Sequence, residues 1–150
     1  MPNWVLDTCA DYLKRLPREY KVEIVEVAAE RRSKSQSIES ARSKETQRLL
    51  DAIPNGDYVV ALDEKGDQLP TKKLAGKLSA WGDQGRNVSI LLGGADGFDY
   101  RCNAKNRQAW PDWHWSLSKM TFPHPLARVI VAEQLYRAWS VLTGHPYHRE

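Results

Sequence analysis

The chain has 150 residues, of which 41% are hydrophobic and 27% are charged, and this composition predicts one folded domain over residues 1–150 and excludes a disordered chain. Its apolar runs are too short to span a bilayer, and its first residues lack the pattern of a secretory signal, so we expect a cytoplasmic protein without a membrane segment. The net charge is +3, and the basic residues gathered around RRSKSQSIESARSK have two interpretations, a solvated loop leading into a helix or an arm that contacts RNA phosphates.

The first third of the chain predicts two helices and a strand. Apolar residues at helical spacing predict a helix over residues 3–16 that ends at Pro17. The β-branched segment KVEIVEVA (residues 21–28) favours a strand. A second helix is expected over residues 38–53, before the turn formed by residues 54–57.

The middle of the chain predicts two buried strands around a helix. DYVVALD (residues 57–63) has five consecutive apolar residues, which is typical of a strand covered on both faces in a parallel sheet. A helix starting near Thr71 and stopped by glycines follows, and NVSILLGG (residues 87–94) is expected to form another buried strand.

The last third predicts a short strand and a long helix. Residues 99–108 favour a helix, and WPDWHWSLS (residues 110–118) favours a short strand. The final helix is expected to start at Pro125 and to end at Gly144. Strands that alternate with helices predict an α/β fold in which a mostly parallel sheet is flanked by helices.

Ligands of parallel α/β sheets bind where the strands end. The predicted strand ends are the end of DYVVALD, the glycine-rich turn of residues 93–97, and the loop of residues 118–122. The turn Gly-Gly-Ala-Asp-Gly offers backbone N–H groups and close approach for a carboxylate or a ribose. It matches neither GxGxxG nor a P-loop, so a plain strand-to-helix turn stays an alternative.

Other site chemistries find little support in the sequence. The four histidines show no HExxH or comparable metal spacing, so we expect no bound metal. Cys9 and Cys102 form no CxxC pair and are expected to stay reduced thiols, and no GxSxG nucleophile elbow is present.

Three segments resemble one known family. LLGGADGF, WSLSKMTFPHPLARVIVAEQLYRAWSVLTGHPYHRE and the opening MPNWV with YLKRLP are similar to the ribosomal RNA large-subunit methyltransferase H family of SPOUT (α/β-knot) enzymes. The resemblance implies a SPOUT fold with a C-terminal trefoil knot, a homodimer, and methyl transfer from S-adenosylmethionine to N3 of a pseudouridine in 23S rRNA of the large ribosomal subunit. Family members begin with a short apolar strand before this Met-Pro, and we expect that strand to be missing here.

The resemblance also implies site residues. The methyl-donor pocket is expected to use one strand end, one glycine and one loop, namely Leu62, Gly93, Leu117, Ser118, Lys119, Met120, Thr121 and Phe122. Catalytic or RNA-binding roles are expected for five polar residues of the C-terminal region, namely His124, Arg137, Tyr147, His148 and Arg149. Histidine as a residue type suits proton transfer, which makes His124 a candidate, and the arginines suit phosphate, but the sequence does not single out one general base.

Two alternatives to this enzyme stay open. One is a ribosome-binding or assembly module that keeps the fold and has lost activity. The other is a SPOUT methyltransferase that acts on another RNA. Donor binding without methyl transfer would favour the module, and the RNA substrate, which no motif reveals, would distinguish the other methyltransferase.

Overall fold

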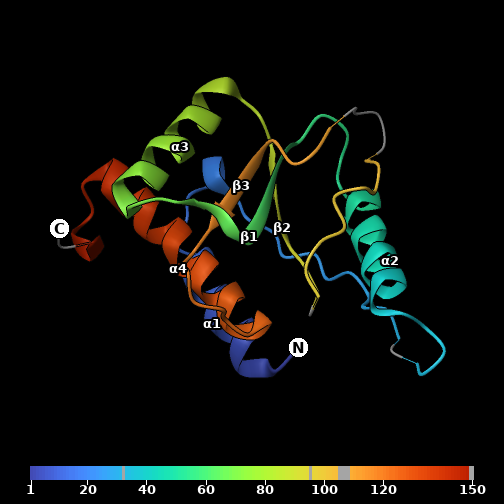
Figure 1. Ribbon diagram of the computed structural model, residues 1–150. Helices are drawn as coiled ribbons and strands as arrows, with labels where there is room; N and C mark the ends of the chain where they lie inside the picture. The colour runs from blue at the N-terminus through green and yellow to red at the C-terminus, as the bar shows by residue number, and fades with distance from the viewer. Residues whose placement is uncertain (32, 95, 105–108, 149–150) are drawn as a thin grey trace. The chain divides into compact units, whose positions relative to one another are not determined.

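The computed structural model describes residues 1–31, 33–94, 96–104 and 109–148 (Figure 1). The chain divides into two compact units, each described here by itself. The sheet unit consists of Val25–Gln68 and Asn87–Lys119, and the helical unit consists of Met1–Ile24, Leu69–Arg86 and Met120–Glu150. The single-domain organisation and the trefoil knot expected from the sequence stay predictions.

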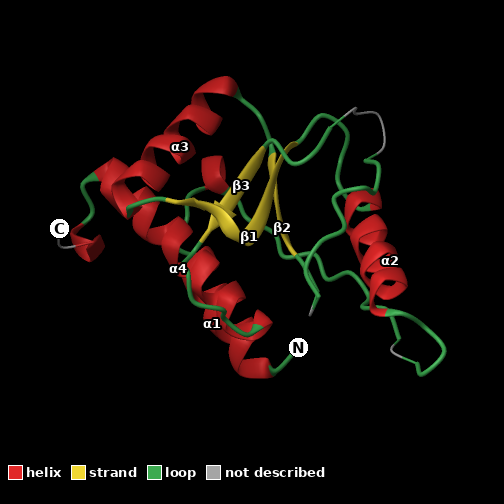
Figure 2. Cartoon of the chain, viewed as in Figure 1, coloured by secondary structure: helices red, strands yellow, loops and turns green. Residues whose placement is uncertain are grey.

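Within the described residues, the sheet unit contains three parallel strands in the order β2-β1-β3 (Figure 2). They are β1 (Tyr58–Gln68), β2 (Val88–Leu92) and β3 (Trp113–Ser116). β1 is the central strand, and its residues Val59, Val60 and Ala61 have no exposed surface. The predicted parallel sheet and its buried apolar strand are therefore confirmed.

Helix α2 (Ile38–Asp51) packs against this sheet. The helix begins where the Ser37 hydroxyl accepts a hydrogen bond from the Ser40 N–H at 3.0 Å, which is the usual way to satisfy a free amide of the first turn. Leu50 of α2 forms one apolar cluster with Val59 of β1 and Leu91 of β2. This cluster joins helix and sheet into one packed layer pair.

The helical unit is built around α4 (His124–Thr143), which contacts both α1 (Asn3–Leu13) and α3 (Thr71–Gln84). Val5 and Cys9 of α1 pack against Ala132 of α4 in a buried cluster. Gly144 ends α4 with a left-handed backbone (φ of +70°), as the sequence predicts. Short 3-10 turns, η1 (Arg18–Tyr20) and η2 (Pro146–His148), complete this unit.

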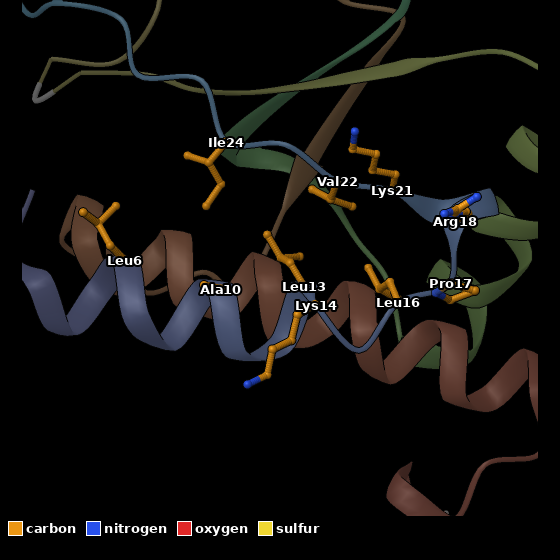
Figure 3. A pocket seen from close by; sticks show the side chains of 10 residues that line it. All are labelled: Leu6, Ala10, Leu13, Lys14, Leu16, Pro17, Arg18, Lys21, Val22 and Ile24. Atoms are coloured by element: carbon orange, nitrogen blue, oxygen red, sulfur yellow. The ribbon is translucent and has the colours of Figure 1, made fainter.

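The strand predicted for residues 21–28 is wrong, because this segment is loop throughout (Figure 2). A strand needs a hydrogen-bonded neighbour as well as β-branched residues, and this segment joins no ladder of the described sheet. Its residues Val22 and Ile24 instead lie beside Leu6 and Leu13 of α1, where they line a hollow of about 450 Å³ (Figure 3).

The helix predicted for residues 99–108 is also wrong over its described part. Residues 99–104 form turns and loop, with the Cys102 N–H bonded to the Asp99 carbonyl at 3.2 Å, and residues 105–108 lie outside the described residues. Side-chain contacts with α2 hold this segment in its irregular shape, as described below.

Candidate functional site

The carboxyl ends of β2 and β3 lie level with Leu62 of β1, but β1 continues to Gln68 and is longer than the strand predicted to end near Leu62. Leu62 of β1 is in register with Leu92 of β2 and with Trp115 of β3. Gly93 directly follows β2, while Leu117 and Ser118 directly follow β3. The structure therefore brings four of the predicted donor-site residues near one another, because the parallel register places Leu62 beside the ends of β2 and β3.

A single serine hydroxyl contacts both β1 and the loop after β3. Ser116 Oγ lies 3.1 Å from the Glu64 carbonyl oxygen and 3.0 Å from the Ser118 carbonyl oxygen. Ser116 is buried, and its single hydroxyl proton is shared between these two carbonyl oxygens. It fixes the loop after β3 relative to the irregular segment that interrupts β1 between Leu62 and Asp67.

The glycine-rich turn after β2 is a narrow bend closed by its own backbone. The Gly97 N–H donates to the Gly94 carbonyl at 3.1 Å, and Gly97 has a left-handed φ of +76°. A Cβ on Gly93 would lie 3.3 Å from the Gly97 carbonyl carbon and from the Phe98 ring. The turn thus needs glycine for its shape, and residue 95 within it lies outside the described residues.

The carboxylate of Glu45, on α2, lies against this turn at Gly94. A Cβ on Gly94 would lie 2.4 Å from Glu45 Oε2, so the carboxylate occupies the space that a side chain would take. Glu45 is itself buried, with 8% of its surface exposed. The helix therefore supports the turn through a polar side chain that sequence reasoning did not single out.

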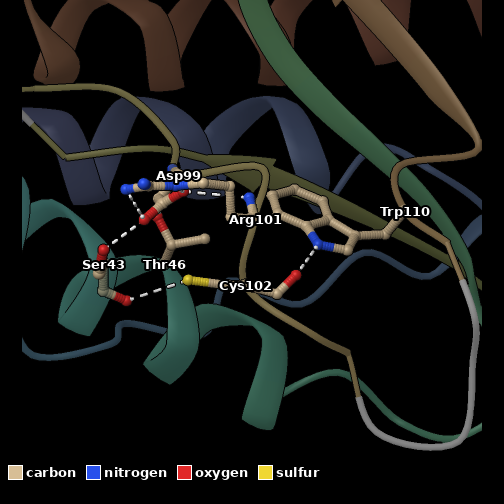
Figure 4. A network of polar contacts seen from close by, with 6 residues as sticks. All are labelled: Ser43, Thr46, Asp99, Arg101, Cys102 and Trp110. Atoms are coloured by element: carbon tan, nitrogen blue, oxygen red, sulfur yellow. Dashed lines mark hydrogen bonds and ion pairs between the residues drawn. The ribbon is translucent and has the colours of Figure 1, made fainter.

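A second set of contacts holds the segment after the turn (Figure 4). The Ser43 hydroxyl donates to the Asp99 carboxylate, and the Asp99 N–H donates to Thr46 Oγ1 at 2.9 Å. Arg101 donates twice to the same carboxylate, from Nε at 3.0 Å and from Nη2 at 3.1 Å. These hydrogen bonds from Arg101 and Ser43 hold the pKa of Asp99 far below its ordinary range, so Asp99 is ionised at neutral pH.

The only sequence signal for this arrangement is the i, i+3 spacing of Ser43 and Thr46, which places both hydroxyls on one face of α2. The basic stretch runs from the loop before α2 into that helix and is partly used inside the sheet unit. Arg48 forms an ion pair with Glu30 at 2.8 Å and donates to the Ala28 carbonyl, while Arg31, Lys34 and Lys44 are exposed. Arg48 thus has partners within the sheet unit, and the loop and RNA-arm interpretations of the stretch both stay open.

Lys119 is exposed and is the last residue of the sheet unit, and the helical unit contains the other predicted site residues. Met120 and Thr121 are exposed and Phe122 is half-buried in the segment that leads to α4, and His124 is the first residue of that helix. Arg149 lies outside the described residues.

A compact polar cluster joins the C-terminal turn to α4. Arg137 Nε donates to Glu133 Oε1 at 2.6 Å, and the Tyr147 hydroxyl donates to the same oxygen at 3.1 Å. The Arg137 guanidinium also lies 5.0 Å from the centre of the Tyr147 ring. Burial, together with hydrogen bonds to Tyr12 and Glu133, raises the pKa of Tyr147 well above its ordinary value, so Tyr147 is a phenol at neutral pH.

His148 is held separately, with Nδ1 lying 3.2 Å from the Ser140 hydroxyl. Ser140 is fully buried, and its hydroxyl also donates to the Arg137 carbonyl at 2.6 Å. The structure thus brings Arg137 of α4 close to Tyr147 and His148 of η2, and the residues that sequence reasoning missed are the α4 partners Glu133 and Ser140.

Over the described part of the chain, no helix is long and apolar enough to cross a membrane. Among these same residues, no group of three or more His, Cys, Asp or Glu side chains is placed to hold a metal ion. Both cysteines are free thiols, and burial raises the pKa of each.

Comparisons with known proteins match the whole of this chain. Residues 1–148 match the family described as "Predicted SPOUT methyltransferase". The chain is 47% identical over 150 residues to "Ribosomal RNA large subunit methyltransferase H" of Methylobacillus flagellatus, covering 100% of this chain and 93% of that protein. A protein of the same name from Hydrogenovibrio crunogenus is 47% identical, with 100% of this chain and 93% of that protein covered. The protein of that name from Coxiella burnetii is 44% identical, with 99% of this chain and 93% of that protein covered. The chain therefore belongs to the SPOUT methyltransferase family.

Proposed function

We propose that this chain is an S-adenosylmethionine-dependent methyltransferase that methylates N3 of a pseudouridine in 23S rRNA of the large ribosomal subunit. The observation that carries the proposal is identity of 44–47% over essentially the whole chain with proteins named as large-subunit rRNA methyltransferases. The N3 pseudouridine position follows from the family resemblance of the C-terminal segment. On this proposal the protein works in the cytoplasm as a homodimer, each chain acting as one catalytic domain.

The edge of the sheet unit fits a methyl donor. Gly93 and Gly94 let the turn keep its narrow bend, because the Gly97 backbone, the Phe98 ring and the Glu45 carboxylate fill the space that side chains would take. We infer that Leu62 and Leu117 supply apolar walls and that backbone groups of the turn bind the polar parts of the donor. The loop of Ser118, Lys119, Met120, Thr121 and Phe122 is proposed to complete the pocket. When bound, S-adenosylmethionine supplies an electrophilic methyl group on a sulfonium.

The chemistry asks the protein mainly to orient the two reactants. The pseudouridine N3–H must lose its proton, so a nearby group accepts or relays it. Tyr147 is a protonated phenol that donates to Glu133, and we therefore propose a binding rather than a base role for it. His124 and His148 are the proposed proton carriers, and Arg137 and Arg149 are proposed to bind RNA.

The experiment is transfer of a radiolabelled methyl group from S-adenosylmethionine to 70S ribosomes and isolated subunits that lack the modification, followed by mapping of the labelled base. Label on N3 of a 23S pseudouridine is the expected result. Label on another RNA contradicts the proposed substrate, and donor binding without any transfer favours a ribosome-binding module.

Two glycine variants, one in the turn and one in the helical unit, test the donor site. Gly93→Val places a side chain 3.3 Å or less from the turn backbone, and we expect donor affinity to fall at least tenfold, the factor equal to about 1.4 kcal/mol. Gly76→Ala lies on an exposed face of α3 with nothing within 4 Å of the new Cβ and should leave donor affinity unchanged. Equal donor affinity in both variants would refute this placement of the site.

A further inference from the structure

The rings of Phe98, Tyr100, Trp110 and His114 form an aromatic cluster in the sheet unit, next to its apolar core. The ring centre of Tyr100 lies 5.9 Å from Phe98, 5.2 Å from Trp110 and 5.1 Å from His114. Phe98 and Trp110 also pack against the core cluster that contains Leu50. The aromatic rings are therefore held against the core through Phe98 and Trp110. Tyr100, which is 39% exposed, and His114 face solvent.

The orientation of the Tyr100 ring is fixed by its hydroxyl. Tyr100 Oη donates to Asp63 Oδ2, and the Lys65 N–H donates to Asp63 Oδ1 at 3.0 Å. Asp63 follows Leu62, the β1 residue proposed to contact the methyl donor. The exposed ring is thus held rigidly, which lowers the entropy that any stacking partner must remove on binding.

A hollow of about 560 Å³ opens beside these rings. Tyr100, Trp113 and His114 line it together with the carboxylates of Asp63 and Asp67. Asp67 Oδ2 accepts a hydrogen bond from Trp113 Nε1 at 3.1 Å, which holds that carboxylate beside the rings. A carboxylate has about four acceptor positions, so Asp63 and Asp67 keep acceptor capacity beyond the bonds described.

The chemistry of this hollow selects a class of ligand. Flat aromatic faces attract another flat ring, and carboxylates accept N–H donors while repelling phosphate. Unpaired RNA bases combine a stacking face with N–H or amino edges, and proteins recognise single-stranded RNA chiefly by stacking such bases on aromatic side chains.

We propose that Tyr100 and His114 form a stacking platform for an unpaired base of the RNA substrate, with Asp63 and Asp67 accepting hydrogen bonds from its edge. The inference rests on the proposed function, because it takes RNA as the substrate, and it assigns to these four residues an RNA contact separate from the donor pocket. Bases with an amino group fit better than uracil, since they offer the carboxylates more N–H donors.

The test measures binding rather than methylation. The probes are fluorescently labelled eight-nucleotide oligoadenylate, oligouridylate and an abasic ribose-phosphate chain of equal length, with affinity measured by anisotropy over a range of salt concentrations. The wild type should bind oligoadenylate more tightly than oligouridylate and the abasic chain least, although all three carry the same phosphates.

Three variants make the test specific. Tyr100→Leu keeps an apolar residue and should weaken oligoadenylate binding about 5- to 150-fold, the range found when one stacking aromatic is removed. Tyr100→Phe keeps an aromatic ring at residue 100, and His114→Trp places a larger ring at residue 114, so both variants should retain most of the oligoadenylate affinity. Because stacking neutralises no phosphate, the slope of log affinity against log salt should be the same in wild type and Tyr100→Leu. Circular dichroism checks that each variant is folded.

The outcomes separate this inference from the proposed function. A wild type that methylates ribosomes while Tyr100→Leu binds oligoadenylate normally overturns the platform alone. Ring-dependent binding by a protein that transfers no methyl group to ribosomes supports the platform and contradicts the enzyme. Equal affinity of the wild type for the adenylate and abasic chains overturns the platform. Tighter binding of an arginine-rich peptide than of every oligonucleotide also overturns it, because the hollow would then bind a guanidinium group.

Discussion

Replacing Gly66 by alanine should destabilise the sheet unit by forcing two strands apart. A Cβ at this position would lie 2.7 Å from the carbonyl carbon and oxygen of His114 and 2.8 Å from the Trp115 nitrogen. These are backbone atoms of β3, which is paired with β1 at Ala61 and Leu62, so they cannot rotate away as a side chain would.

The magnitude follows from the size of the overlap. Extra atoms forced into a packed region cost about 1–3 kcal/mol when the backbone must shift. For a chain of this length each kcal/mol lowers the melting temperature by roughly 2–4 °C, so we expect a fall of roughly 2–12 °C for Gly66→Ala. Urea denaturation and thermal melting followed by circular dichroism measure it.

Gly76→Ala is the matched control, because it makes the same chemical change on an exposed face of α3. Nothing lies within 4 Å of its added Cβ, and alanine favours a helix over glycine by about 0.5–1 kcal/mol, so this variant should be more stable than the wild type. A Gly66→Ala protein as stable as the wild type would refute the reasoning, since it would mean that β1 and β3 separate at no cost.

Three further outcomes test the packing and the electrostatics. Leu50→Ala should lower the free energy of unfolding by about 2–5 kcal/mol, because it empties the cluster between α2 and the sheet, and a loss below 1 kcal/mol would contradict that packing. Ser37→Ala removes the side-chain cap of α2 and should cost about 1 kcal/mol, measured by the same denaturation. Because Arg101 depresses the pKa of Asp99, the ionised carboxylate stabilises the folded chain above pH ~3.9, and this contribution is lost as the pH falls through the folded-state value. Asp99→Asn should therefore be less stable than the wild type at pH 7, with the difference narrowing from about pH 5 downwards; a constant difference would contradict this account.

Elements with a strong local apolar pattern could be predicted from the sequence. The buried run of β1 and the apolar face of α3 are both where the pattern places them, because burial on a sheet or helix face leaves a periodic trace. The segment 21–28 failed for the opposite reason. Its β-branched residues state a preference for extended backbone, but the partner that would turn it into a strand is a property of the whole fold.

The candidate site divides in the same way. Leu62, Gly93 and Leu117 could be placed at one edge of the sheet because parallel strands impose that geometry. Glu45 and Glu133 could not be singled out, because the groups that they contact lie far from them in the sequence. Glu45 contacts the turn at Gly94, and Glu133 accepts a hydrogen bond from Tyr147 of the C-terminal turn.

The glycine-rich turn owes its position to a helix far away in the chain. Ser43 and Thr46 are 56 and 53 residues from the Asp99 groups that they bind, and Glu45 supports the turn itself. Contacts over such separations form only after the intervening chain has been ordered. The turn is therefore not a portable motif: the same five residues grafted onto the end of a strand in another protein would lose their support. A redesign that aims to transplant donor binding must move α2 together with the turn.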